Sequence, residues 1–397
     1  MTPFRPDVSR TVVSPSRRDD RFDFLRGIAL LIIFIDHVPK NVFEPFTLHA
    51  FAFCDAAEMF FFISGCVAAM VYGRMMEKKG FVTAAKRVWR RAGVVYGAQL
   101  FLLLAVVALA GVFLAATGDQ NFRWIFRVFW VFENPLAYVI PTLTLHYQPA
   151  YGDILPCYVV LLAVFPLALM GLSRNIWLVL VPSFALWLAV QVFGLGLWTT
   201  SGERWFFNPF AWQFLFVLGA LFGHPALKGR MTFLDSPLLF RAAAALVGVI
   251  AVVQFSAALN AFLPVIPSLR PDNLPLDKTA LQPLRLLSFF ALAVVTYRYL
   301  PAAGTLTRNG AALLVIRCGR FSLQVFTFGA LLSSFAVVSL ILSGNNQLIQ
   351  TLVCIAGVGA QLAYAAWRDR EREECPPVDA PAGSLVVVRS QWRRRDR

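Results

Sequence analysis

Charged residues are scarce in this chain, because Asp, Glu, Lys and Arg make up only 15% of its 397 residues. Soluble domains carry about 25% charged residues, whereas hydrophobic residues reach 58% here and the mean hydropathy is +0.65. This composition excludes an ordinary soluble domain. Apolar runs of about 20 residues recur along the chain, which is the length needed to span a hydrocarbon core of about 30 Å. We therefore expect a polytopic integral membrane protein.

The usual metal ligands are also few, with six cysteines and four histidines. No C-x-x-C pair and no Cys/His ligand spacing is present, so we predict neither a metal site nor a disulfide framework. A cleavable signal peptide is not expected, because the first twenty residues are polar and basic and no short apolar core with a cleavage site follows them. The first apolar run begins at Phe24 and is long enough to remain as a span.

The formal charge of +14 suggests an anionic partner. Lys and Arg nevertheless gather in short segments that flank the apolar runs, which is the pattern of cytoplasmic loops. We therefore predict the lipid bilayer as a partner and no nucleic acid.

The predicted fold class is an all-α integral membrane protein with about ten transmembrane helices and both termini in the cytoplasm, because the basic segments then share one side. Residues 1–22 would form a basic cytoplasmic tail, 23–367 a single transmembrane domain, and 368–397 a charged, disordered cytoplasmic tail. The aromatic connection 117–151 favours an amphipathic helix at the interface. The spans are expected at about 24–43, 51–73, 92–116, 152–171, 176–194, 208–223, 240–263, 282–300, 321–343 and 347–367.

The first span carries two ionisable residues, Arg26 and His37, that are eleven residues apart. In an α-helix this is close to three turns, so both side chains lie on one face, about 16 Å apart along the axis. Ionisable groups inside a span usually face a cavity or a partner. The simpler interpretation makes Arg26 a positive-inside anchor and His37 a packing histidine.

A carboxylate beside a histidine fixes its tautomer and raises its basicity, which is the usual design of a general base. Glu58 in the second span reaches a depth similar to that of His37 if the two helices are antiparallel neighbours. Asp36 and Asp55 are alternative partners of the histidine. A structural ion pair that neutralises two buried charges is the competing interpretation.

Further polar groups gather at the predicted outer ends of the spans. Aromatic faces and side-chain amides suit hydroxyl-rich sugars, whereas a carboxylated acyl group favours Arg or Lys. An aromatic belt is the simpler explanation for the Trp and Tyr residues. The candidate substrate-binding residues are Asn41, Tyr151, Asp153, Trp212, Gln213, Lys278 and Arg285.

Several stretches together resemble one family. Arg-x10-His in the first span followed by FFFISG in the second resembles the acyltransferase type 3 membrane family. The closer similarity is to its OpgC branch, named for succinylation of osmoregulated periplasmic glucans, and it covers roughly residues 17–370. The matching stretches are RRDDRFDFLRGIALLIIFIDHVPKN, AAEMFFFISGCVAAMVYG, HYQPAYGDILPCYVVLL, NPFAWQFLFVLG, LDKTALQPLRLLSFFALA and GRFSLQVFTFG.

The resemblance implies an acyl-CoA-dependent O-acyltransferase in the bacterial inner membrane, with acyl-CoA as co-substrate and a periplasmic glucan as acceptor. Succinyl-CoA is the donor that the family name implies. The residues that would bind the CoA phosphates are Arg26, Arg87, Arg90 and Arg91, because guanidinium groups match phosphate oxygens. His37 would deprotonate the sugar hydroxyl and Glu58 would orient its ring.

Two other functions compete with this interpretation. A glycan or lipid-linked sugar transporter or flippase could use the same polar groups as a pathway, although no matched pair of interrupted spans is present. An O-acetyltransferase that acts on another envelope polysaccharide would keep the chemistry and change the acyl group.

Overall fold

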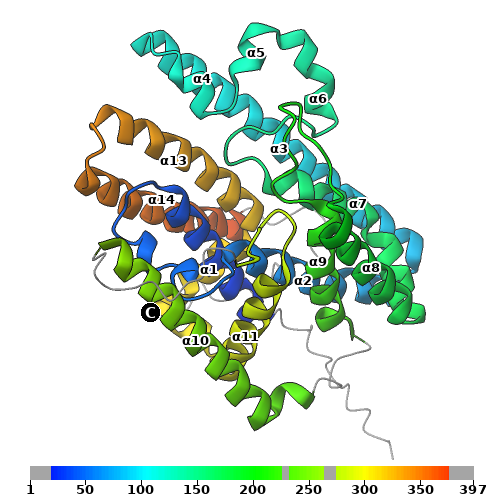
Figure 1. Ribbon diagram of the computed structural model, residues 1–397. Helices are drawn as coiled ribbons and strands as arrows, with labels where there is room; N and C mark the ends of the chain where they lie inside the picture. Colours follow the sequence, from blue (N-terminus) through cyan, green and yellow to red (C-terminus); the bar gives the residue numbers. More distant parts are fainter. Residues whose placement is uncertain (1–18, 226–231, 263–273, 375–397) are drawn as a thin grey trace, which may run out of the picture.

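The structure is a computed structural model, and it describes residues 19–225, 232–262 and 274–374 (Figure 1). Within these ranges the regular structure is helical, and the one β-type contact is an isolated antiparallel bridge between Trp198 and Arg204. The predicted all-α fold class is therefore confirmed.

Each of the ten ranges predicted as spans contains one long helix. Six of these helices, namely α2, α3, α7, α10, α13 and α14, are long and apolar enough to cross a membrane, and α8 and α9 are shorter apolar helices. The bounds are α1 (Asp20–His37), α2 (Ala56–Lys79), α3 (Phe81–Thr117), α7 (Ile154–Arg174), α8 (Trp177–Phe193), α9 (Pro209–Gly223), α10 (Pro237–Phe262), α11 (Pro283–Tyr299), α13 (Ser322–Leu342) and α14 (Gln347–Glu374).

Helices also occur in the connections between the predicted spans. The connection between the spans expected at 282–300 and 321–343 contains a further helix, α12 (Gly310–Arg320). The basic segment between the second and third spans is helical on both sides of Gly80, whose φ of 82° lets the chain turn there. The connection after α3 is not one interfacial helix. It forms α4 (Asn121–Ile125), α5 (Phe129–Glu133), η3 (Pro135–Tyr138) and α6 (Val139–Leu143).

Short 3₁₀ turns complete the described chain. They are η1 (Glu44–Phe46), η2 (Leu48–Ala50), η5 (Thr232–Asp235) and η6 (Leu306–Arg308). The predicted N-terminal tail lies outside the described residues up to residue 18, and its last three residues already belong to α1. The first residues of the predicted C-terminal tail continue α14 as far as Glu374, and residues 375–397 lie outside the description.

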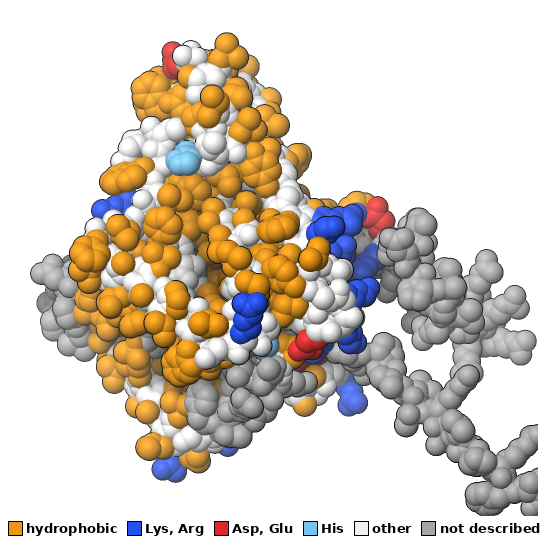
Figure 2. Space-filling view, turned by 90° about the vertical axis from the view of Figure 1, so that its right-hand side faces the viewer, with side chains coloured by type: hydrophobic (Ala, Val, Ile, Leu, Met, Phe, Trp, Pro, Cys, Tyr) orange, Lys and Arg blue, Asp and Glu red, His pale blue; other side chains and the backbone are white. Residues whose placement is uncertain are grey.

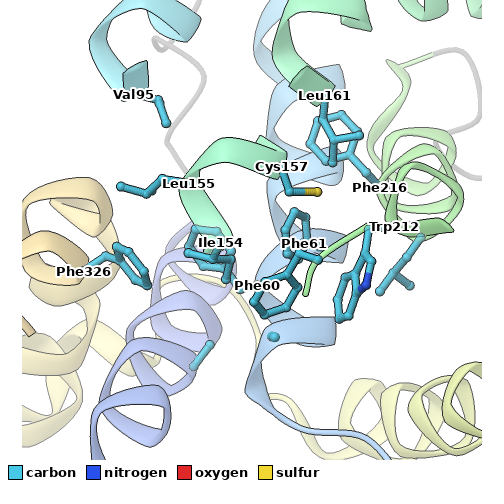
Figure 3. Packing of buried hydrophobic residues seen from close by; sticks show 14 of the residues in the cluster. Phe60, Phe61, Val95, Ile154, Leu155, Cys157, Leu161, Trp212, Phe216 and Phe326 are labelled. Atoms are coloured by element: carbon cyan, nitrogen blue, oxygen red, sulfur yellow. The ribbon is translucent and has the colours of Figure 1, made fainter. Parts of the chain in front are cut away.

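Helix α2 occupies the centre of the fold and packs most extensively against α9. Small residues allow this approach, because a Cβ on Gly65 or Gly219 would overlap a backbone carbonyl oxygen of the facing helix. Aromatic rings fill the space beside this contact, including Phe61 and Trp212, whose ring centroids are 4.9 Å apart (Figure 3). The result is a tightly packed frame that fixes the N-terminal end of α2.

Helix α1 lies among α2, α12, α13 and α14 (Figure 1). Its close contact with α12 again depends on glycine, because a Cβ on Gly27 would overlap the carbonyl oxygen of Val315, and one on Gly319 would overlap that of Asp23. The two helices therefore touch through their backbones. This contact brings Arg320, at the end of α12, to the same end of α1 as Arg26.

The outer surface is strongly apolar. Figure 2 shows one face covered mainly by hydrophobic side chains, with many of the Lys and Arg side chains toward one side. Exposed residues on the long helices include Leu104, Phe193, Phe255 and Leu352, each more than half exposed. Such a surface is unfavourable in water and suits a hydrocarbon environment.

Candidate active site

Two cavities follow one another along the same side of α1. One has a volume of about 220 Å³ and is lined by Arg26, and we call it the arginine cavity. The other has a volume of about 280 Å³ and is lined by Leu30, Ile33 and His37, and we call it the histidine cavity. Because these positions recur at intervals of three and four residues, they share one face of the helix.

His37 is the last residue of α1, and a local contact fixes its tautomer. Its Nδ1 lies 2.5 Å from the carbonyl oxygen of Ile33. Since a carbonyl oxygen only accepts hydrogen bonds, Nδ1 carries the proton and Nε2 keeps its lone pair. The ring also packs edge-on against Tyr151, with centroids 5.0 Å apart. The histidine is therefore prepared to accept a proton at Nε2.

Asp36 does not orient His37 in this structure, because it faces a second histidine, His49 of η2. The distance from Asp36 Oδ1 to His49 Nδ1 is 3.5 Å, and both residues line the histidine cavity. The Thr47 hydroxyl donates to the Glu44 carbonyl oxygen at 3.0 Å, so its oxygen accepts from His49 Nδ1 at 2.8 Å. The interaction with the nearby Asp36 carboxylate is the main cause that raises the pKa of His49 above 6.5, despite the partial burial of the ring.

Glu58 also has a partner other than His37. Its carboxylate accepts from the backbone N–H of Asp55 at 3.0 Å, which completes a capping box at the start of α2. The same carboxylate accepts from Nε of Arg285 at 2.7 Å. Arg285 also reaches Asp55 at 3.2 Å, and Asp55 pairs with Lys278 at 2.6 Å. These four residues form a charge cluster with two anions and two cations.

The charge cluster borders the histidine cavity through only two of its members. Asp55 and Lys278 line the cavity. The ammonium group of Lys278 lies 5.3 Å from the ring centroids of both Phe206 and Phe207, within the range of cation–π contacts. Glu58 is fully buried behind them and acts on the site by holding Arg285 and Asp55.

Of the other predicted substrate-binding residues, Tyr151 and Asp153 line the histidine cavity. The remaining three use their polar groups within the fold. Asn41 donates to the carbonyls of Ile35 and Val38 and accepts from two backbone N–H groups, so it caps the end of α1. Gln213 bonds with Ser183 of α8. The indole of Trp212 donates to the carbonyl of Lys278 at 3.1 Å and holds that residue in place.

The arginine cavity contains two of the four arginines predicted to bind phosphate, Arg26 and Arg91. The other two, Arg87 and Arg90, are exposed on the same helix as Arg91 and do not line the cavity. A third cation, Arg320, lines the cavity instead, and its guanidinium lies 3.8 Å from Asp369.

The polar groups that accompany these arginines are hydroxyls, from Ser64, Tyr72, Tyr158 and Ser322. No Asp or Glu belongs to the lining of this cavity. A lining of guanidinium and hydroxyl donors suits phosphate oxygens.

Sequence reasoning missed Arg320 and His49. Arg320 belongs to the quoted stretch GRFSLQVFTFG, but no helix was expected in the segment before it. His49 follows the first span in a short connection, and only the return of η2 toward Asp36 brings its ring to the cavity.

Phe326 of α13 lines both cavities and lies between them. In Figure 3 its ring points toward Ile154 of α7, and Phe60 of α2 lies close by. The centroids of Phe326 and Phe60 are 6.4 Å apart. The two cavities are therefore neighbours that meet at the ring of Phe326.

Comparison with known proteins assigns the chain to a family. No curated protein and no solved structure matches the chain. The model of one family, described as OpgC protein, matches residues 18–373. The match includes both cavities and every helix described here except the final residue of α14. The chain therefore belongs to the OpgC family.

Proposed function

We propose that this protein is a membrane O-acyltransferase that moves an acyl group from acyl-CoA onto hydroxyls of periplasmic glucans in the bacterial inner membrane. Membership of the OpgC family supports acyl transfer to glucans. The observation that carries the proposal is the order of the two cavities along α1, with arginines in one and His37 in the other. A donor with phosphates at one end and a thioester at the other fits that order.

In this proposal the arginine cavity holds the phosphates of CoA at the cytoplasmic end. Arg26, Arg91 and Arg320 supply the positive charge and the paired N–H donors that phosphate oxygens accept. The eleven residues from Arg26 to His37 correspond to about 16 Å along the helix. An extended phosphopantetheine arm has a length of the same order, so the thioester would lie near His37.

The histidine cavity would hold the sugar acceptor. Its lining combines the aromatic rings of Tyr151, Phe206 and Phe207 with the carboxylates of Asp36 and Asp153. Aromatic rings present apolar faces to the C–H groups of a sugar, and carboxylates accept hydrogen bonds from its hydroxyls. This mixture suits a neutral, hydroxyl-rich ligand.

The chemical step follows from the tautomer of His37. Nε2 takes the proton of the sugar hydroxyl while the hydroxyl oxygen attacks the thioester carbonyl carbon. A carbon–oxygen bond forms, the carbon–sulfur bond breaks, and CoA leaves as a thiolate. The imidazolium of His37 then returns its proton to that thiolate, so His37 ends the cycle neutral.

The acyl group proposed is succinyl, which comes from the family name. Lys278 is the lining residue suited to its free carboxylate, because its ammonium group faces the cavity beside Phe206 and Phe207. Binding there would draw Lys278 away from Asp55, whose charge Arg285 also balances.

The test is a His37→Ala variant in cells that make periplasmic glucans. We expect the protein to keep its thermal stability and the glucans to remain in the periplasm without the acyl group. Mass spectrometry of the glucans distinguishes a succinyl from an acetyl increment in the wild type. Loss of the glucans from the periplasm would instead support a transporter, and an acetyl increment would support the O-acetyltransferase.

A further inference from the structure

Gln361 of α14 lines the histidine cavity in the middle of the helix packing. Its exposure is 1%. Its backbone carbonyl accepts from the thiol of Cys318. Within the described residues, its side-chain nitrogen has no hydrogen-bond partner. A buried amide donor without an acceptor destabilises a fold, so its presence beside a cavity points to an acceptor on a ligand.

The residues around Gln361 offer this donor no acceptor from a side chain. Apolar side chains that line the same cavity include Leu30, Phe34 and Phe326. The hydroxyl of Ser333 donates to the carbonyl of Gly329 at 3.0 Å. No hydrogen bond joins this hydroxyl to Gln361, whose side-chain nitrogen stays without an acceptor among the described residues.

The packing of α13 makes room for the amide. A Cβ on Gly329 would lie 3.0 Å from Oε1 of Gln361, so glycine at this position lets the side chain of Gln361 lie against the helix. Gly329 follows Phe326 by three residues, slightly less than one helical turn, and lines the histidine cavity. Gln361 therefore lies near Phe326 and lines the same cavity as His37.

We propose that Gln361 binds an amide carbonyl of the pantetheine arm of the acyl donor, an inference that rests on the acyl-CoA dependence proposed above. The arm carries two amide groups between its phosphate and its sulfur. With the phosphates at Arg26 and the thioester at His37, those amides lie in the stretch that Gln361 borders. A neutral amide donor suits this depth, because it satisfies a carbonyl oxygen without placing a charge among apolar side chains.

The test compares Gln361→Met with Gln350→Met in purified protein, using succinyl-CoA and glucan. Gln350 is a matched control, since it is a fully buried glutamine of α14 that bonds with Ser339 and lines neither cavity. Loss of one neutral hydrogen bond made equally in ground and transition states should raise KM for succinyl-CoA about 3- to 10-fold. We expect kcat to stay within about twofold, because no transition-state contact is lost. Gln350→Met should leave KM unchanged.

A second experiment uses acyl thioesters that keep or lack the amide carbonyl to which Gln361 is proposed to donate. The succinyl thioester of N-acetylcysteamine keeps one of the amides, whereas that of a simple alkanethiol lacks both. Gln361→Met should weaken use of the first compound and leave use of the second unchanged. Equal effects on both compounds, or no effect in a variant with wild-type thermal stability, would overturn the proposal.

The kinetic pattern also separates other roles of Gln361. A fall in kcat without a rise in KM would assign Gln361 to the oxyanion of the transition state and overturn the amide contact. Failure of the wild type to use any acyl-CoA would refute the proposed function itself. An active wild type with an unaffected Gln361→Met variant would refute only the role of Gln361.

Discussion

The charge cluster at the start of α2 gives the sharpest prediction about stability. The Glu58 carboxylate is fully buried, and two nitrogens of Arg285 lie 2.6 and 2.7 Å from one of its oxygens. Replacing Arg285 with Met removes the guanidinium and leaves that carboxylate without its cation. Lys278 does not replace Arg285, because its ammonium group pairs with Asp55.

The size of the effect follows from the burial of the pair. Breaking a buried ion pair by removing one partner costs about 3–5 kcal/mol of unfolding free energy, because the remaining charge stays desolvated. We therefore expect Arg285→Met to lower the thermal unfolding midpoint by several degrees in detergent, followed by tryptophan fluorescence. Glu58→Gln should cost less, because Gln can still accept from the backbone of Asp55 and Arg285 can still pair with Asp55.

The double variant decides whether the buried charge is the cause. Arg285→Met combined with Glu58→Gln removes both charges, so it should recover at least half of the stability lost in Arg285→Met alone. A double variant as unstable as Arg285→Met would refute this explanation. A Glu58→Gln protein with normal stability but a shifted pH profile of transfer would show instead that Glu58 acts on His37.

Two further predictions concern the cavities. Arg320→Met should raise KM for acyl-CoA about tenfold or more, since a hydrogen bond to a charged group contributes about 1.5–3 kcal/mol. Arg90→Met changes an exposed arginine outside the cavity and should leave KM unchanged. Equal KM values for the two variants in steady-state assays would exclude phosphate binding by Arg320. Asp36→Asn should lower the pKa of His49, because Asp36 is the main cause of its rise above 6.5. The stabilisation by this pair is fully present below pH 6.5 and is lost as pH rises through the higher pKa of the folded state. The unfolding free energy of the variant should therefore be lower than that of the wild type at acidic pH, by less than about 1 kcal/mol at this half-exposed site. The two values should converge at alkaline pH. A difference in unfolding free energy that grows as the pH rises would contradict this prediction.

The sequence predicts the positions of the long helices well, because apolar runs of span length are a strong local signal. Helix α12 was missed for a physical reason. It is eleven residues long and carries Arg317 and Arg320 in its last turn, so it has no span-length run. Its position depends on the backbone contact of Gly27 and Gly319 with the facing helices, and such a contact leaves no local pattern in the sequence.

The candidate site also contains residues whose positions the sequence predicts and residues whose partners it does not. The Arg26–His37 spacing places both residues on cavities along one helix face, because helix geometry alone fixes that relation. Helix geometry does not determine the partners of the carboxylates. Glu58 and Asp36 were both expected beside His37, but each pairs with another residue. Arg285 is 227 residues away from Glu58, and the return of a short loop places His49 by Asp36. Asn41 and Gln213 have the composition of ligand-binding residues, yet local backbone and helix packing satisfy their amides.

The position of Phe326 has a consequence for how the two cavities respond to substitution. Its ring belongs to the lining of both the arginine cavity and the histidine cavity. Because one side chain contributes to both linings, a different rotamer or a smaller residue at this position would change the shape of both cavities together. The two halves of the candidate site therefore share one structural element and cannot be reshaped independently at that point.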